Sequence, residues 1–218
     1  MGPTFLEWLY GSHHKAFNDD LVMWAASCGR TELVDWLLER MPKQGQNLPN
    51  IALAYSAKYG HLTLVRKIFP SATDYNPALE NAAKNRHLHV LEWFLEKIPP
   101  QDWSAQIMTI AASTGNLDSV EWLHENVPNT CSYLAMDLAA GYGHLDIMEW
   151  FYRNCDHEHS FTLLSLLIAT RKGYLDIVKW LYKYFPEFKS HLDLVEMVSK
   201  EFGQLHIASW ASSVNSSE

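Results

Sequence analysis

Apolar side chains recur along this chain in a pattern that fits one face of an α-helix. After Gly143 they occupy offsets of two, four, five, seven and eight residues, as Leu145, Ile147, Met148, Trp150 and Phe151. These offsets form one broad stripe on a helix, and the intervening Asp146 and Glu149 face water. The same spacing returns after Gly173. The pattern therefore predicts amphipathic helices that begin just after a glycine.

Tryptophan marks the period of this pattern. Seven of the nine tryptophans occupy the same point in it, mostly 28 to 30 residues apart: Trp8, Trp36, Trp93, Trp122, Trp150, Trp180 and Trp210. The one long gap spans 57 residues, about two periods, and Lys67 stands where the missing tryptophan would fall. Such a period indicates stacked units whose apolar faces are covered by their neighbours. Because the tryptophans follow the apolar stripe, we interpret them as packing residues and not as ligand-binding ones.

A glycine stands seven residues before each internal point of the tryptophan column, except where Arg86 replaces it, and small residues such as Ala139 and Ala140 precede it. Glycine can end a helix in a left-handed conformation without steric cost, and small side chains let two helices approach closely. Eight of the nine prolines fall between one unit and the next, where helices must stop. Each unit is therefore predicted to be a helix, a tight turn and a second helix.

We expect about seven such units in a single domain over residues 1–211. Residues 1–17 are predicted to be an N-terminal half-repeat cap, because only a second helix is recognisable there. Residues 190–211 are predicted to be a C-terminal cap repeat, since Ser199 and Lys200 replace the small pair. Caps shield the terminal apolar faces of a stack. Residues 212–218 are expected to form a frayed tail.

The turn segments resemble a known family. Residues 82–88, 111–117 and 139–147 resemble the Ala-Ala-x-x-Gly-His-Leu core of ankyrin repeats. The resemblance covers nearly the whole chain and implies an all-α, ankyrin-like solenoid of about seven short repeats. The usual Thr-Pro-Leu-His opening is absent and the units are short, so the β-hairpin fingers should be reduced to loops. The tryptophan in the second helix and the sequence of residues 131–140 resemble the divergent ankyrin arrays of oomycetes, amoebae and giant viruses.

Composition limits the cellular compartments and the partners that we expect for this protein. Hydrophobic residues make up 48% of the chain, which is enough for a continuous core. The three cysteines, Cys28, Cys131 and Cys155, lie in different units and indicate a reducing compartment, not a disulfide scaffold. With no signal peptide or membrane span recognisable, we expect a cytoplasmic protein, with the nucleus or a host cytosol as alternatives. The net charge of −8 argues against nucleic-acid binding, and we expect a monomer without a membrane partner.

The negative charge is concentrated in the middle of the chain. Residues 101–160 contain one basic side chain, Arg153, against nine acidic ones. One interpretation is a surface that attracts a basic partner by electrostatic steering. The interpretation we favour is that these residues form a solvated helix face.

The resemblance implies that the first helices line the concave side of the array and that partners dock there. Offsets of five, two and one residues before the turn glycine share one face of the first helix, and this face mixes aromatic, aliphatic and basic residues. Because aromatic residues dominate binding hot spots, we expect it to bind another protein. The alternative is that the residues at offset minus five are buried between units. Trp103 is added from a connector, as a candidate exposed anchor. The candidate residues are Trp24, Tyr55, Lys58, Tyr59, Asn81, Lys84, Trp103, Ile110, Leu138, Tyr142, Ile168, Arg171 and Lys172.

No phosphate-binding loop, nucleophile elbow or His-Glu-x-x-His motif is present, so we expect neither an enzyme nor a cofactor. One connector contains Cys155, His157 and His159 at alternate positions. A structural zinc site, however, has four ligands, usually at wider spacing. A polar surface loop is favoured there, and no metal is expected. His61, His87 and His144 follow the turn and are expected to make local backbone hydrogen bonds. The predicted function is a non-catalytic protein-interaction scaffold; the alternative is a substrate-recognition adaptor of a larger complex or a pathogen protein that targets a host protein.

Overall fold

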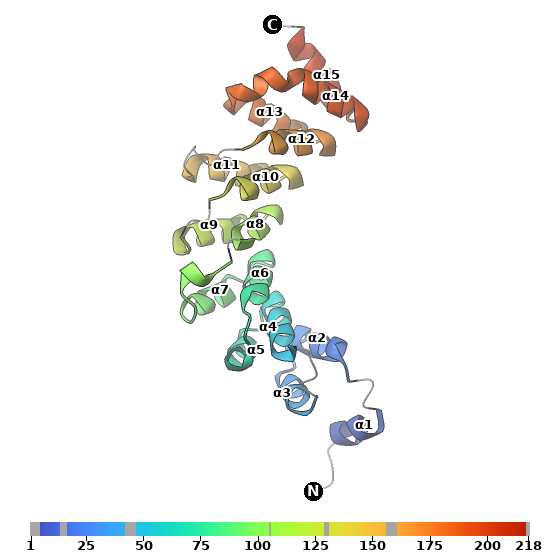
Figure 1. Ribbon diagram of the computed structural model, residues 1–218, viewed down its shortest axis with the longest axis vertical. Coiled ribbons are helices and arrows are strands. Elements are labelled where there is room, and N and C mark those ends of the chain that lie inside the picture. Colours follow the sequence, from blue (N-terminus) through green and yellow to red (C-terminus); the bar gives the residue numbers. More distant parts are fainter. Residues whose placement is uncertain are drawn as a thin grey trace. The chain divides into compact units, whose positions relative to one another are not determined.

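The protein is described by a computed structural model that covers residues 5–13, 17–41, 47–104, 106–128, 131–155 and 161–216 (Figure 1). Within these residues the regular structure is entirely helical, and no strand is found. The chain divides into two compact units, Met1–Ser104 and Ala105–Glu218, which are described separately below. The predicted all-α, ankyrin-like architecture is confirmed.

Unit 1 consists of a single helix followed by three helix pairs. The first helices α2, α4 and α6 stack on one another, and each pairs with the second helix that follows it. Short 3-10 turns at Phe69–Ser71 and Pro100–Asp102 follow the second and third pairs. The helices are α1 (Phe5–His13), α2 (Asp19–Ser27), α3 (Thr31–Arg40), α4 (Leu48–Lys58), α5 (Leu62–Ile68), α6 (Asn76–Lys84) and α7 (Leu88–Leu95).

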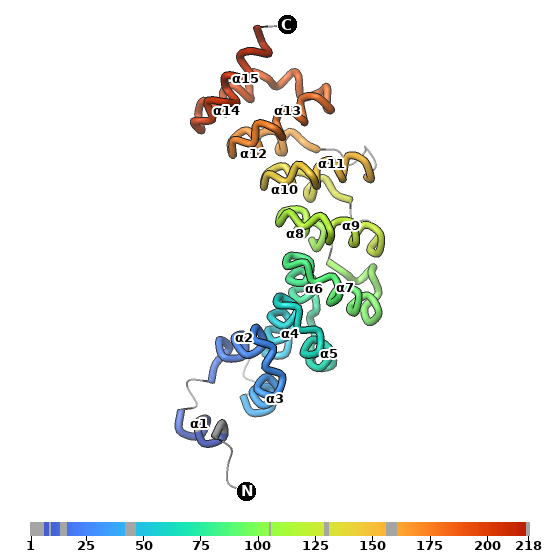
Figure 2. Tube along the Cα trace, turned by 180° about the vertical axis from the view of Figure 1, so that it is seen from behind, coloured from blue at the N-terminus to red at the C-terminus, as the bar shows by residue number. Residues whose placement is uncertain are grey.

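Unit 2 contains four helix pairs built in the same way. The first helices α8, α10, α12 and α14 stack in order, as both views show (Figures 1 and 2). The last helix reaches Asn215, where the sequence had led us to expect a frayed tail from residue 212. The helices are α8 (Gln106–Ser113), α9 (Leu117–Asn126), α10 (Tyr133–Tyr142), α11 (Leu145–Asn154), α12 (Leu163–Lys172), α13 (Leu175–Tyr184), α14 (Leu192–Glu201) and α15 (Leu205–Asn215).

The turn between the two helices of each pair has the predicted left-handed residue. Six glycines there have φ between 63° and 88°, and Arg86 adopts the same conformation with φ 62°. The next backbone N–H donates to a carbonyl five residues earlier, as from His61 to Ser56 at 2.9 Å. This bond satisfies a carbonyl that the helix end leaves without a partner. The predicted helix, turn and helix are therefore confirmed.

Packing between repeats gives a second reason for glycine at the turn. A Cβ placed on Gly60 would lie 2.7 Å from His87 Nδ1, and one on Gly115 would lie 2.6 Å from His144 Cε1. In each case the ring belongs to the following repeat and rests on the bare backbone of the turn. Any side chain at these positions would separate neighbouring repeats, so the glycine is required by packing as well as by its φ angle.

The histidines after the turn bond to the preceding repeat, so the expectation of local bonds was wrong. Nε2–H of His61 donates to the Ser27 carbonyl at 2.8 Å, and the corresponding His144 bond reaches Ser113 at 3.1 Å. His87 bonds to the Lys58 carbonyl at 2.9 Å. Partial burial lowers the pKa of His87, although this hydrogen bond opposes the shift. In these three cases the carbonyl that ends a first helix connects one repeat to the next.

The tryptophan column forms an aromatic layer among the second helices. Five tryptophans each meet, edge to face, the residue two positions past the corresponding column position of the preceding repeat. Five such pairs occur in the described residues, with centroids 5.1 to 5.6 Å apart and interplanar angles of 84° to 89°: Tyr10 with Trp36, Phe69 with Trp93, His124 with Trp150, Tyr152 with Trp180 and Tyr182 with Trp210. Edge-to-face contact is a preferred aromatic geometry. The packing interpretation is confirmed for these five tryptophans.

Trp8 and Lys67 have different surroundings. Trp8, on α1, is exposed. Lys67, which replaces a tryptophan, forms an ion pair with Asp35 of the preceding repeat. The lysine therefore also contacts the preceding repeat, but by charge at the surface, where an ion pair contributes about 0 to 1 kcal/mol.

Candidate functional site

The first-helix face of unit 1 exposes aromatic rings beside lysines. Trp24 on α2 and Tyr59 at the end of α4 are 54% and 48% exposed, respectively. Lys58 Nζ lies 5.5 Å from the ring centroid of Tyr55 and 5.4 Å from that of Tyr59, within cation–π range. Lys84, one repeat further along, is exposed. This part of the predicted surface therefore combines rings and positive charge, and the cation–π pairs are formed within one repeat.

In unit 2 the corresponding pairs form between repeats. Tyr142 ends α10 and is 56% exposed, and Lys172 of the next repeat places Nζ 6.0 Å from its ring centroid. Arg171 similarly lies 5.9 Å from the Phe202 ring of the repeat that follows. The residues one and two positions before the turn thus come together across neighbouring first helices.

Residues at offset minus five are less accessible, apart from Trp24. Asn81 donates from Nδ2 to the Ala54 carbonyl of the preceding repeat at 3.3 Å. Ile168 packs over Gly141, where an added Cβ would lie only 2.9 Å from its Cγ2. Ile110, Leu138 and Tyr55 are half-buried. Asn81 and Ile168 are also half-buried, and both contact a neighbouring repeat, while Trp24 remains open to solvent.

Trp103 does not belong to this surface, and its prediction as an exposed anchor was wrong. The side chain is only 7% exposed, and its indole N–H donates to the Ile98 carbonyl at 3.2 Å. The 3-10 turn at Pro100–Asp102 ends at Trp103, and the indole N–H reaches back to the connector at Ile98. A proline-rich connector was expected to present the ring outward, but the turn geometry directs it inward.

Two exposed leucines of unit 2, Leu134 and Leu164, extend the first-helix face beyond the sequence prediction. The two leucines lie nine residues before their turn glycines, one helical turn ahead of offset minus five. Offsets of minus nine, minus five and minus one fall on one stripe of a helix. The same periodicity that identified the face could therefore have identified them.

The acidic residues of the segment 101–160 have different surroundings in the structure. Asp118, Glu121 and Glu125 are exposed along α9, a second helix, as expected for a solvated helix face. Asp137 is instead buried in α10, where it accepts hydrogen bonds from the backbone N–H and hydroxyl of Thr162 at 2.9 and 2.6 Å. Burial raises the pKa of Asp137 against the opposing effect of these bonds. Asp137 thus connects two repeats instead of facing solvent.

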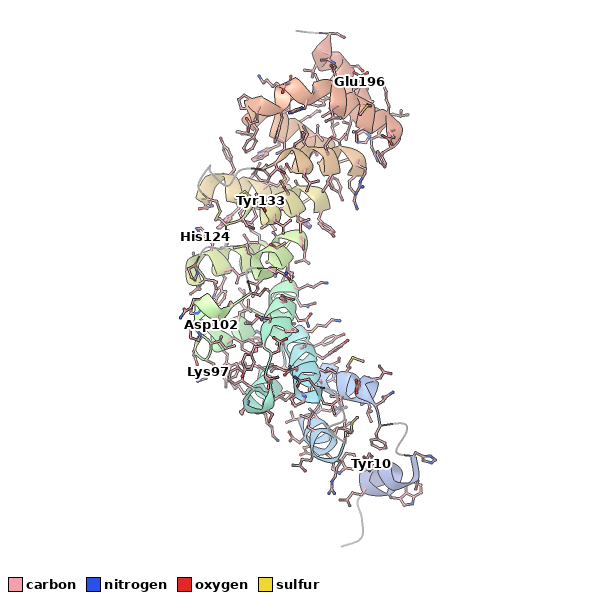
Figure 3. All side chains as sticks on the ribbon, in the orientation of Figure 1. Tyr10, Lys97, Asp102, His124, Tyr133 and Glu196 are labelled. Atoms are coloured by element: carbon pink, nitrogen blue, oxygen red, sulfur yellow. A yellow bond between two sulfur atoms is a disulfide. The ribbon has the colours of Figure 1, made fainter. Side chains whose placement is uncertain are left out.

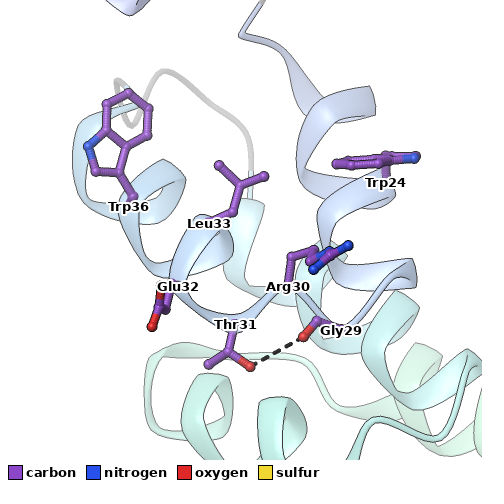
Figure 4. A pocket seen from close by; sticks show the side chains of 7 residues that line it. All are labelled: Trp24, Gly29, Arg30, Thr31, Glu32, Leu33 and Trp36. Atoms are coloured by element: carbon purple, nitrogen blue, oxygen red, sulfur yellow. Dashed lines mark hydrogen bonds between the residues drawn. The ribbon is translucent and has the colours of Figure 1, made fainter. Parts of the chain in front are cut away.

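An open groove of about 780 Å³ lies beside Trp24 in unit 1 (Figure 4). The Trp24 ring on α2 and the Trp36 ring on α3 lie on opposite sides of it, with Leu33 between them. Arg30 and Glu32 supply charge at the turn between the two helices. The groove gives the first-helix face of unit 1 a concave neighbour with apolar walls.

A disulfide joins Cys131 to Cys155, so the expectation of unpaired cysteines was wrong for these two. Cys131 precedes α10 and Cys155 follows α11, and the bond therefore closes the base of one helix pair, across 24 residues of sequence. His124 of the preceding repeat places Nδ1 3.5 Å from the Cys131 sulfur. Cys28 is an exposed free thiol. His157 and His159, the other residues considered with Cys155, lie outside the described residues.

None of the described helices has the length and apolar character that a bilayer crossing requires. Residues 108–194 match the family model of ankyrin repeats, in three copies. The structure is similar to the ankyrin repeat domain of human ASB11, with a TM-score of 0.56 and 17% sequence identity over 75% of this chain and 83% of that one. No curated protein matches the sequence.

Ankyrin repeats are generally modules that bind other proteins, and their fold is typically non-catalytic. Neither the family match nor the structural match indicates a family of enzymes. Both matches agree with the stacked helix pairs and left-handed turns described above. The chain therefore has an ankyrin-like fold, and residues 108–194 match the ankyrin-repeat family.

Proposed function

We propose that this protein is a non-catalytic scaffold that binds a protein partner through its first-helix face, the side that lines the concave surface in ankyrin-like arrays. One observation carries the proposal: exposed aromatic rings at the ends of first helices have lysines beside them. Tyr59 and Tyr142 are about half exposed, and each has an ammonium group within 6.0 Å of its ring. Tyrosines bury a large area on binding at a low cost in conformational entropy, which suits them to anchor a partner.

The chemistry of this face favours a partner segment that carries both acidic and apolar side chains. Lys58, Lys84, Arg171 and Lys172 supply positive charge on a chain whose net charge is −8. Acidic groups of the partner would meet these cations, while Leu134 and Leu164 would accept apolar contacts in unit 2. Charge of this kind raises the rate of encounter and selects the orientation, whereas the aromatic and apolar contacts supply most of the affinity.

The test compares two variants and measures the thermal stability of each. Trp24, Tyr59 and Tyr142 are replaced together by alanine to remove the exposed rings of the first-helix face. The control is Leu205→Ala, because Leu205 is 73% exposed on a second helix and is also apolar. Both variants and the wild type serve as bait for affinity capture from cells, followed by mass spectrometry, and their melting temperatures are measured in parallel.

We expect the triple variant to lose the captured partner while its melting temperature stays close to that of the wild type. The Leu205→Ala variant should retain the partner. Retention of the same partner by the triple variant would contradict binding through this face. A large fall in its melting temperature would instead show that the rings are part of the packing.

A further inference from the structure

His124, Cys131 and Cys155 form a cluster outside the first-helix face. Their three ligand atoms lie within 4.8 Å of one another. The two cysteines come from the two ends of one helix pair. His124 comes from α9 of the preceding repeat (Figure 3). The cluster therefore brings together three side chains of the kinds that bind transition metals, from elements that stack independently of it.

The geometry of the cluster fits a tetrahedral metal ion. With Zn–S near 2.3 Å and Zn–N near 2.0 Å, neighbouring tetrahedral ligand atoms are about 3.5 to 3.8 Å apart. His124 Nδ1 already lies 3.5 Å from the Cys131 sulfur. The Cα atoms of the cysteines are 6.1 Å apart, so rotation of the side chains can separate two unbonded sulfurs without a shift of the helices.

The surroundings hold the imidazole in place. The His124 ring meets the Trp150 ring edge to face, with centroids 5.1 Å apart. His124 and Cys131 are half-buried and Cys155 is buried. Two ligands therefore remain in reach of solvent, which leaves room for a water molecule as a fourth ligand.

We propose that the reduced pair Cys131 and Cys155, together with His124, binds one Zn²⁺ or a similar borderline-soft divalent cation. Two thiolates and one imidazole select such ions over Mg²⁺ and Ca²⁺, which prefer oxygen ligands. The metal would join the same two cysteines that the disulfide joins and would add a link to the preceding repeat through His124. The site is independent of the proposed partner-binding face.

Metal binding and the disulfide exclude each other. A dithiol reductant supplies two electrons and two protons, the sulfur–sulfur bond breaks, two thiols form, and the reductant becomes a disulfide. Zn²⁺ then binds the two sulfurs as thiolates, and their two protons pass to solvent. The oxidised chain has no thiolate to offer at this site and should not bind the ion there.

The test uses the full chain without an affinity tag, reduced with a dithiol and desalted in the absence of oxygen. Co²⁺ is the probe, because cobalt bound to thiolates absorbs in the near ultraviolet and a tetrahedral site adds visible bands. We expect these bands to saturate at one Co²⁺ per chain and to disappear when Zn²⁺ displaces the cobalt. The melting temperature of the reduced chain should rise with Zn²⁺ and fall when a chelator removes it.

Three variants assign the ligands. Cys131→Ser should abolish the thiolate bands, and circular dichroism confirms that it is folded. His124→Gln, which keeps both thiols, should weaken Co²⁺ binding by about tenfold or more. Cys28→Ser is the matched control, because Cys28 is the remaining cysteine of the chain and lies outside the cluster; it should leave the bands unchanged.

Several results would overturn the proposal. They are the absence of saturable Co²⁺ bands in the reduced wild type, equal binding by the oxidised chain, full affinity in His124→Gln, and loss of the bands in Cys28→Ser. If Cys131→Ser does not fold, His124→Gln and the Zn²⁺ dependence of the melting temperature in the wild type still decide the matter.

Discussion

Aromatic residues occupy two regions of the repeats and have different surroundings in the two regions. In the layer of second helices, Trp180 is 8% exposed and meets the rings of Tyr152 and Phe161 among others. At the end of a first helix, Tyr142 is 56% exposed and has Lys172 beside its ring. The comparison shows that an aromatic residue packs between repeats or lies exposed according to its offset from the turn glycine.

The backbone explains this difference. A residue seven positions after the turn glycine lies on the apolar stripe of the second helix. There it contacts the preceding repeat, as Trp180 contacts Tyr152, two residues after Trp150. A residue one position before the turn lies at the end of the first helix, on the side opposite the buried alanines. Both offsets are fixed by the turn, so the two regions recur in every repeat.

The largest expected effect comes from removing a ring of the packed layer. Trp180→Ala should destabilise the chain by about 3 to 5 kcal/mol, because it leaves a cavity between repeats. Trp24→Ala is the matched control, since Trp24 is 54% exposed. Urea unfolding followed by circular dichroism measures both. Equal losses in the two variants would contradict the distinction between the regions.

The histidine links predict the next effect. His144→Ala should cost about 1 to 3 kcal/mol, since it leaves the Ser113 carbonyl without its partner from the next repeat. The chain itself offers the conservative replacement: Gln204, at the same position after the turn, donates to the Arg171 carbonyl at 3.2 Å. His144→Gln should therefore recover most of the loss in the same urea experiment. No recovery would mean that the ring on Gly115, and not the bond, carries the effect.

The sequence was sufficient for the features that every repeat needs. The turn glycines and the tryptophan column recur because each repeat has the same backbone conformation and the same neighbour. The histidine bonds were assigned to the wrong partner, since a carbonyl one repeat earlier is about 30 residues away in sequence and adjacent only in the stack. The prediction that Trp103 is exposed was wrong because the orientation of this side chain depends on a single 3-10 turn, and the sequence periodicity does not indicate that turn.

The cysteine cluster could be predicted only in part. Cys131 and Cys155 stand twelve residues before and after Gly143, which places both at the base of one helix pair. That symmetry is a usable signal for their proximity. The approach of His124 depends on how the preceding repeat stacks, and the sequence does not encode that distance in any local pattern.

The protonation of His87 tests the packed side of the comparison through pH. Its folded-state pKa is lowered mainly by burial, below the usual value of about 6.5 that applies in the unfolded chain. The unfolded chain therefore binds a proton at higher pH, so stability present above pH ~6.5 is lost as the pH falls toward the folded-state pKa. The melting temperature of wild type should fall more between pH 7.5 and 5.5 than that of His87→Gln. The same fall in both would exclude His87 as a source of the pH dependence.

A substitution in the turn of the third helix pair, at Arg86, is expected to increase the stability of the chain. Arg86 holds φ at 62°, a conformation that glycine adopts without strain. Arg86→Gly is expected to stabilise the chain by up to about 1 kcal/mol, the relief of strain being partly offset by the greater freedom of glycine in the unfolded state. Arg86→Ala is the control, because it keeps the Cβ and should bring no gain. A clear loss in Arg86→Gly, measured by urea unfolding, would show that the arginine side chain stabilises the fold.

The smallest effect on stability is expected where the effect on binding is largest. Tyr142→Ala should change the free energy of unfolding by no more than about 0.5 kcal/mol, because the ring is more than half exposed. Its interaction with Lys172 contributes about 0.5 to 1 kcal/mol at most at an exposed site, and a double-mutant cycle with Lys172→Ala measures that part. Partner capture should nevertheless fall sharply in Tyr142→Ala. If the variant instead loses as much stability as Trp180→Ala, then this ring belongs to the packing of the repeats, and the two regions do not differ in the way their exposure indicates.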